Sequence, residues 1–126
     1  MATVLICDDS SPIRVLLSRK LTQAGFQVVG NAKDGEEGVQ IYSQTRPDIT
    51  ILDVTMPNKD GRACLAEIMK INATAKVVMV SALQDAAVVD SCLKEGAKAF
   101  ISKDKLYKDD DFKDHVLKTI DSILKV

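Results

Sequence analysis

Five short runs of aliphatic and β-branched residues alternate along the chain with longer segments in which apolar residues recur every three or four positions. Short runs that are apolar throughout are typical of strands buried on both faces of a sheet, and the longer spacing is typical of amphipathic helices. We therefore predict strands over residues 3–7, 27–30, 49–52, 76–80 and 97–101. The expected helices cover residues 12–24, 35–45, 61–71, 84–95 and 111–125.

Several of these boundaries carry local signals. Ser11 is the expected N-cap of the first helix, because Pro12 then occupies the first helical position, and Gly25 ends that helix. The acidic run 109–111 is expected to cap the last helix. Each strand is thus followed by a helix that can cross back over the sheet.

Strands alternating with helices indicate an α/β fold with a parallel sheet covered on both faces. Right-handed crossovers leave few ways to wind five strands, and we predict the doubly wound order 2-1-3-4-5. In this arrangement ligands bind outside the carboxyl ends of the strands, at the switch point between strands 1 and 3.

Length and composition narrow the class of protein. A chain of 126 residues, 46% apolar and 28% charged, is expected to form one globular domain over 1–126, without an output domain. The net charge of −1 is spread along the chain, which argues against nucleic-acid binding. No apolar run approaches the roughly 18 residues of a membrane helix, and no signal peptide precedes the first strand. The three separated cysteines suggest reduced thiols and a cytoplasmic protein.

Polar side chains follow four of the five strands. Asp8 and Asp9 come after the first strand, Asp53 after the third, Ser81 after the fourth and Lys103 after the fifth. Each alone could be a helix-start charge, a turn residue or a solvated chain end. Because the carboxyl ends of parallel strands share one edge of the sheet, the set predicts a single site there.

Three carboxylates gathered at one edge need a cation. Like charges about 4 Å apart repel by about 4 kcal/mol per pair at an effective dielectric of about 20. Oxygen ligands without His or Cys point to Mg²⁺, and Lys103 with the Ser81 hydroxyl could bind a phosphoryl group. Asp53, after the central strand, is the carboxylate best placed to attack phosphorus.

With these residues in place, the chain resembles the receiver domains of response regulators over nearly its whole length, and in particular the CheY-like, single-domain regulators of chemotaxis. The resemblance implies a flavodoxin-like, CheY-like fold. The matching pieces are Asp8 with Asp9, the stretch 53–57 with Asp60 and Gly61 after it, Ser81 with Ala82, and Phe100 three residues before Lys103.

The resemblance implies a role for each residue of the expected magnesium site. Asp53 would be the phosphoacceptor. Asp9 would bind Mg²⁺ directly, while Asp8 would act mainly through water. The backbone carbonyl of Thr55 would complete the set of ligands.

The resemblance also implies a mechanism. A histidine kinase would donate a phosphoryl group to Asp53, Ser81 would move toward it, and the switch aromatic Phe100 would turn inward. Lys103 would neutralise the phosphoryl charge.

The altered surface of the fourth and fifth helices and the fifth strand would then bind a downstream protein such as a flagellar motor switch, and a phosphatase could end the signal. The protein is expected to be a monomer and to catalyse only its own phosphoryl transfer and dephosphorylation.

Two features depart from the family's pattern. Asp104 stands where the family usually has a proline, often after a cis bond, and a cis bond without proline costs about 2.5 to 4 kcal/mol. The turn that presents Lys103 is therefore a place where this chain can differ. The connection 105–110 is longer than usual, and Thr55 and Leu83 occupy positions that tune the lifetime of the acyl phosphate in the family.

Other functions fit the residues less well. A phosphorelay intermediate or a regulator of another pathway remains an alternative within the family. A haloacid-dehalogenase-type phosphatase also uses an aspartyl nucleophile and Mg²⁺, but it carries Asp-x-Asp after its first strand, whereas Asp8 and Asp9 are adjacent. A flavodoxin is disfavoured because these two acids would repel the flavin phosphate. Residues 30–35 have the glycine spacing of a phosphate loop but lack the lysine and hydroxyl that should follow.

Overall fold

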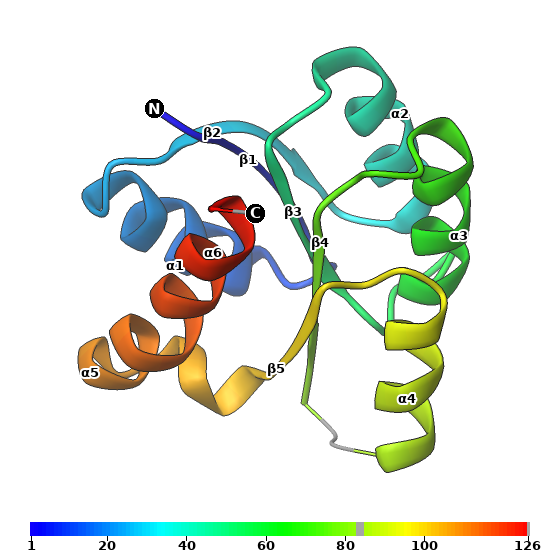
Figure 1. The fold of residues 1–126 in the computed structure, drawn as a ribbon. Coiled ribbons are helices and arrows are strands. Elements are labelled where there is room, and N and C mark those ends of the chain that lie inside the picture. The colour runs from blue at the N-terminus through cyan, green and yellow to red at the C-terminus, as the bar shows by residue number, and fades with distance from the viewer. Residues whose placement is uncertain (83–84, 126) are drawn as a thin grey trace.

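A parallel sheet forms the centre of the protein (Figure 1). The structure is a computed structural model and describes residues 1–82 and 85–125. The sheet has the order β2-β1-β3-β4-β5, so the predicted doubly wound α/β fold is confirmed. The strands are β1 (Thr3–Cys7), β2 (Gln27–Ala32), β3 (Ile49–Asp53), β4 (Val77–Ser81) and β5 (Ala99–Ser102).

Helices cover both faces of the sheet (Figure 1). On one face lie α1 (Ser11–Gln23) and the C-terminal segment, and on the other lie α2 (Gly35–Thr45), α3 (Gly61–Ile71) and α4 (Ala86–Lys94). The C-terminal segment consists of the 3-10 turn η1 (Lys103–Leu106), α5 (Asp109–Asp111), the π-helical η2 (Phe112–Leu117) and α6 (Lys118–Leu124). Among the described residues, no helix combines the length and apolar character needed to cross a membrane.

The sheet separates two apolar cores. Along β1, Val4 and Ile6 belong to the core beneath α1, whereas Leu5 and Cys7 belong to the core beneath α2 and α3. All four side chains are at most 1% exposed, because successive residues of a strand point to opposite faces and both faces are covered. This two-sided burial explains why the strands are mostly apolar, and it leaves charged side chains only at the strand ends.

Two predicted boundaries near the N-terminus are wrong in detail. The N-cap of α1 is Ser10 instead of Ser11, and its hydroxyl accepts a hydrogen bond from the Ile13 amide at 3.4 Å. Pro12 still lies in the first turn, where a missing N–H costs nothing. Strand β2 continues to Ala32, two residues past the predicted end, because pairing with β1 extends to the Cys7–Ala32 pair.

The C-terminal segment differs most from the prediction. The acidic run does not cap a helix that starts at Asp111; it forms the first helical turn, α5, after Lys108. The turn η1 was not predicted, and the bond between Lys103 and Asp104 is trans, since no cis peptide bond occurs among the described residues. The predicted start of the fourth helix at Gln84 and the position of Leu83 lie outside the described residues. Helix α4 begins at Ala86, and Asp85 caps it by accepting from the Ala87 amide at 2.8 Å.

Gly61 allows α3 to begin directly against the end of β3. A Cβ atom at Gly61 would lie 1.9 Å from the backbone oxygen of Asp53, while the Gly61 amide donates to the Val54 carbonyl at 2.8 Å.

We expect Gly61→Ala to lower the free energy of unfolding by about 2 kcal/mol or more in urea titrations. Gly25→Ala is the control: its Cβ would meet nothing within 4 Å, so only the strain of its positive φ, about 1 kcal/mol, is expected. Equal costs for the two variants would contradict the close approach at Gly61.

Candidate functional site

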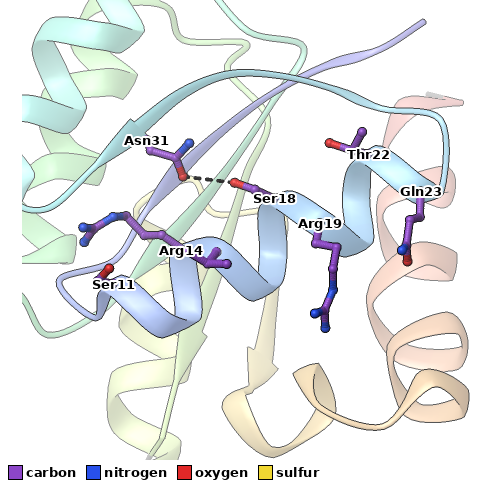
Figure 2. Close-up of a pocket in the computed structure, with 8 residues that line it drawn as sticks. Ser11, Arg14, Ser18, Arg19, Thr22, Gln23 and Asn31 are labelled. Carbon is purple, nitrogen blue, oxygen red and sulfur yellow. Dashed lines mark hydrogen bonds between the residues drawn. The ribbon is translucent and has the colours of Figure 1, made fainter.

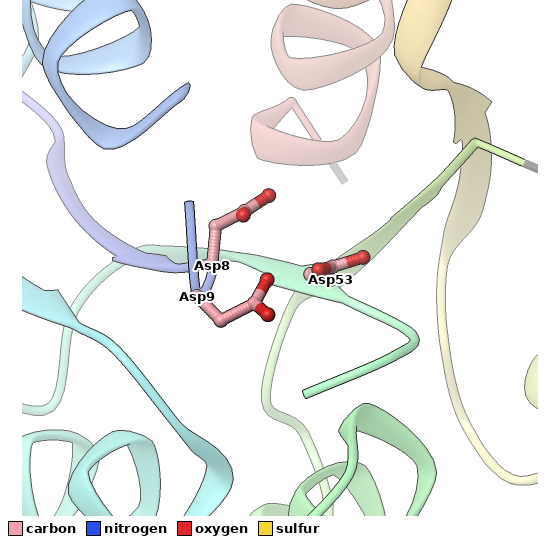
Figure 3. Close-up of side chains that lie close together, drawn as sticks. All are labelled: Asp8, Asp9 and Asp53. Atoms are coloured by element: carbon pink, nitrogen blue, oxygen red, sulfur yellow. The ribbon is translucent and has the colours of Figure 1, made fainter. Parts of the chain in front are cut away.

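Three carboxylates meet at the carboxyl edge of the sheet (Figure 3). Cys7 of β1 pairs with Leu52 of β3, so the residues that follow, Asp8 and Asp53, lie side by side. One oxygen from each of Asp8, Asp9 and Asp53 lies within 4.8 Å of the others. Asp8 is 2% exposed and Asp53 is 4% exposed, whereas Asp9 is open to solvent. The predicted convergence of acids from two loops is therefore present.

Hydrogen bonds hold the Asp8 loop in place. The Asp8 amide donates to the Ala32 carbonyl at 3.0 Å, and the Ser10 amide donates to Asp8 Oδ1 at 2.8 Å. Arg14 Nη1 of α1 donates to the Asp8 carbonyl at 2.7 Å. The sequence analysis did not single out Arg14, although a basic side chain one turn into the helix after an acidic loop is a recognisable signal. This arginine connects α1 to the site.

Lys103 joins the two buried carboxylates. Its Nζ lies 3.1 Å from Asp8 Oδ2 and 3.3 Å from Asp53 Oδ2. Lys103 begins η1 directly after β5, so the side chain reaches across the edge of the sheet from two strands away. The predicted approach of Lys103 to the acids is therefore present, and the lysine balances part of their negative charge.

Electrostatics at the site disfavour a fully ionised set of acids. Burial and then the nearby charge of Asp8 raise the pKa of Asp53 from 3.8 to about 6, against the opposing effect of Lys103. Burial alone would lower the pKa of Lys103, but hydrogen bonds and charge attraction to Asp8 and Asp53 outweigh it and raise the pKa. One ammonium group therefore does not compensate three carboxylates.

The donor set fits Mg²⁺. It offers only carboxylate oxygens, and it includes the exposed Asp9 as a point of access. Burial and then the charge of Asp8 raise the pKa of Asp53, and a divalent cation would favour its charged form. The residues that would hold the ion are Asp8, Asp9 and Asp53.

The remaining predicted residues lie around these acids. Ser81 ends β4, one position beyond the residue that pairs with Asp53, and it is 8% exposed. The exposed Thr55 brings its amide 3.5 Å from Asp53 Oδ1. Phe100 in β5 is half-buried and packs against the core on the α3 side. Register and burial thus place Ser81 at the same edge as the acids. Ser81 pairs with Ser102 of β5, and Phe100 lies two residues before Ser102.

The loop after Asp53 is tied to the start of α2 by two contacts that the sequence analysis missed. Asn58, in a left-handed conformation with φ of 65°, donates its side-chain amide to Asp34 Oδ2 at 2.9 Å. The Gly35 amide donates to the Lys59 carbonyl at 2.9 Å, and a Cβ at Gly35 would clash with that carbonyl. The predicted strand 49–52 and helix 61–71 left a loop between them, but only the fold identifies the partner of this loop.

A groove lies beside the site, on the outer surface of α1 (Figure 2). It has a volume of about 570 Å³, and Ser18 Oγ donates to Asn31 Oδ1 across it at 3.3 Å. None of the clustered carboxylates lines it, so it is separate from the charged site. Its lining residues are Ser11, Arg14, Val15, Ser18, Arg19, Thr22, Gln23 and Asn31.

Comparisons with known sequences agree with this geometry. The family model described as the response regulator receiver domain matches residues 4–117. The chain is 43% identical over 100 residues to chemotaxis protein CheY of Thermotoga maritima. The aligned residues cover 79% of this chain and 83% of the relative. It is 41% identical over 103 residues to chemotaxis protein CheY of Listeria monocytogenes, covering 82% of this chain and 87% of the relative.

Solved structures give the same result. A chain of the CheX-CheY-BeF3-Mg+2 complex from Borrelia burgdorferi superposes with a TM-score of 0.87 at 40% identity, covering 97% of this chain and 88% of that one. A CheY-like receiver domain protein from Methanospirillum hungatei superposes with a TM-score of 0.85 at 22% identity, covering 99% and 98%. The second likeness supports the fold alone.

The raised pKa of Asp53 predicts a pH-dependent stability. Between pH 3.8 and about 6 the folded protein keeps a proton on Asp53 that the unfolded chain has lost, so the free energy of unfolding falls as pH rises through this window. Asp53→Asn removes this loss and is expected to be more stable than the wild type by about 1 to 2 kcal/mol at pH 7, with no difference below pH 4.

Urea unfolding in EDTA between pH 4 and pH 7 measures the difference in the free energy of unfolding between Asp53→Asn and the wild type. Asp90→Asn is the matched control, because Asp90 is exposed and forms its ion pair with Lys94 on the same helix, away from the acids. A constant offset between Asp53→Asn and the wild type over the whole pH range would contradict the prediction.

Proposed function

The chain belongs to the family of response regulator receiver domains, and from this premise we propose that Asp53 is the residue through which it is switched. Proteins of this family are phosphorylation-activated switches of two-component systems, and this chain is one of them. The observation that carries the proposal is the position of Lys103 Nζ, 3.3 Å from Asp53 Oδ2 and 3.1 Å from Asp8 Oδ2. A buried carboxylate next to an ammonium group at the edge of the sheet is equipped to accept a phosphoryl group.

The proposed reaction is phosphoryl transfer to Asp53. A carboxylate oxygen of Asp53 attacks the phosphorus of a phosphohistidine, the P–N bond breaks, and the histidine leaves with the electron pair. Lys103 stabilises the negative charge on the phosphoryl oxygens. Asp9, Asp53 and the Thr55 carbonyl would hold Mg²⁺, with Asp8 acting mainly through water. When bound, the ion would neutralise charge shared by carboxylate and phosphoryl oxygens.

The proposed switch runs from Ser81 to Phe100. The Ser81 hydroxyl donates a hydrogen bond to a phosphoryl oxygen, and Phe100 turns inward from its half-buried position on β5. The surface formed by α4, β5 and the C-terminal segment changes as a result. Phosphorylation needs to favour the second arrangement by only a few kcal/mol for a partner to detect it.

The partners follow from the family and its relatives. A receiver domain implies a histidine kinase as phosphodonor and a downstream target. Because relatives at about 40% identity are chemotaxis proteins CheY, we propose that the output is chemotaxis, with a flagellar motor switch as the target. The Borrelia neighbour was solved in a complex with CheX, which supports a second partner that recognises the activated state, such as a phosphatase. The proposed setting is the cytoplasm, with the protein acting as a monomer that signals by docking.

Magnesium should stabilise the protein through the three carboxylates. A ligand that binds only the folded state at about ten times its Kd adds about 1.4 kcal/mol to the free energy of unfolding. We expect MgCl₂ to raise the Tm of the wild type, and Asp9→Asn to lose most of that increase. Differential scanning fluorimetry over a MgCl₂ titration measures it, with Asp90→Asn as a control that keeps the full increase. An unchanged response in Asp9→Asn would contradict the proposed ligand set.

Phosphorylation tests the proposed acceptor directly. The wild type, incubated with MgCl₂ and acetyl phosphate, is expected to gain one phosphoryl group by intact-mass spectrometry, because acetyl phosphate can replace phosphohistidine as donor. Asp53→Asn should gain none, and Asp90→Asn should behave as the wild type. Lys103→Met should be phosphorylated at least about tenfold more slowly, given the role of an ammonium group in stabilising transferred charge. Phosphoryl gain by Asp53→Asn would overturn Asp53 as the acceptor.

A further inference from the structure

Lys20 is a buried charged residue that the proposed reaction does not use. It lies on the inner side of α1 and is 7% exposed. Its Nζ donates to the carbonyls of Leu106 at 3.0 Å and Tyr107 at 2.6 Å. The same atom lies 3.3 Å from Asp109 Oδ1 and 5.1 Å from the centre of the Phe112 ring. Every one of these partners belongs to the segment that follows Lys103.

Apart from Lys20, that segment is held mainly by apolar core residues such as Leu106 and Phe112. The turn η1 starts at Lys103, and the following bond to Asp104 is trans and lacks the rigidity of proline. Lys108 precedes α5 without a side-chain cap. Leu106 is fully buried in the core beneath α1, and its carbonyl and the next one point to Lys20. Lys20 therefore fixes the far end of the turn whose first residue is Lys103.

Helix α1 holds the other side of the site as well. Arg14, six residues before Lys20, donates to the Asp8 carbonyl at 2.7 Å. Six residues of helix span about 9 Å. The same helix therefore contacts the Asp8 backbone through Arg14 and the turn after Lys103 through Lys20. The two residues of the 3.1 Å Lys103–Asp8 ion pair therefore both belong to segments that α1 contacts through hydrogen bonds.

We propose that Lys20 is a positioning residue that holds the Lys103 ammonium at the phosphoryl-accepting site by clamping the turn η1 to α1. This inference rests on the proposed function of Lys103. The carboxylates come from the loops after β1 and β3, which Lys20 does not contact, so the clamp acts on phosphoryl binding and leaves Mg²⁺ binding to the acids.

The experiment uses Lys20→Met, which keeps the apolar length of the side chain and removes the charge and the donors. The probe is beryllofluoride, a stand-in for the phosphoryl group on a carboxylate, titrated in MgCl₂ and followed by backbone amide NMR shifts. We expect the affinity for beryllofluoride to fall by about 3- to 30-fold, while the Mg²⁺ affinity changes less than about twofold. Arg19→Met is the matched control, since it removes an exposed positive charge from the same helix and should bind as the wild type.

A double-mutant cycle separates positioning from general loss of stability. If Lys20 acts through Lys103, adding Lys20→Met to Lys103→Met should cost little further beryllofluoride affinity, and the two losses will be non-additive. Additive losses, or a single variant that binds within twofold of the wild type, would overturn the inference. Should Lys20→Met fail to fold, the same cycle with Lys20→Gln, which removes the charge and shortens the side chain, decides by the same criterion. A wild type that binds Mg²⁺ but no beryllofluoride would overturn the proposed function itself, and the inference with it.

Discussion

Repulsion among carboxylates is the constraint that organises this protein. Asp8 and Asp53 are both almost fully buried and stand on adjacent strands, which raises the pKa of Asp53 to about 6. The Lys103 ammonium between them offsets part of that charge, and the remainder is what makes the site receptive to a cation. Charge that the folded protein leaves incompletely balanced is therefore the basis on which it can bind Mg²⁺ and respond to a phosphoryl group.

The rest of the fold holds these charged side chains in position. Two-sided cores lock β1 and β3, and α1 ties down the neighbours of the site through Arg14 and Lys20. The opposite flank is less constrained: α4 fully buries only Cys92 among its side chains. An element with few buried side chains can shift at low cost, which suits α4 to its proposed place in the surface that reports phosphorylation.

Much of the architecture could be read from residue patterns. Continuous apolar runs predict buried parallel strands, and right-handed crossovers then predict the strand order, because few windings satisfy both constraints. The same reasoning predicts that Asp8, Asp9, Asp53 and Lys103 share one edge. The prediction for the C-terminal segment was wrong in detail. The acidic run 109–111 was expected to cap a helix, but it forms a helical turn. Its first residue, Asp109, pairs with Lys20, which lies far earlier in the chain.

By itself the sequence determined the kind of sheet, its order and the edge where charged groups gather, because these depend on periodicity and on the direction of parallel strands. Only the tertiary structure decided how far each charge is buried, which carbonyls Lys20 and Arg14 bind, and how the turn after Lys103 is held. Those outcomes depend on contacts between segments distant in the chain, and desolvation and hydrogen-bond geometry have no local signature in the order of residues.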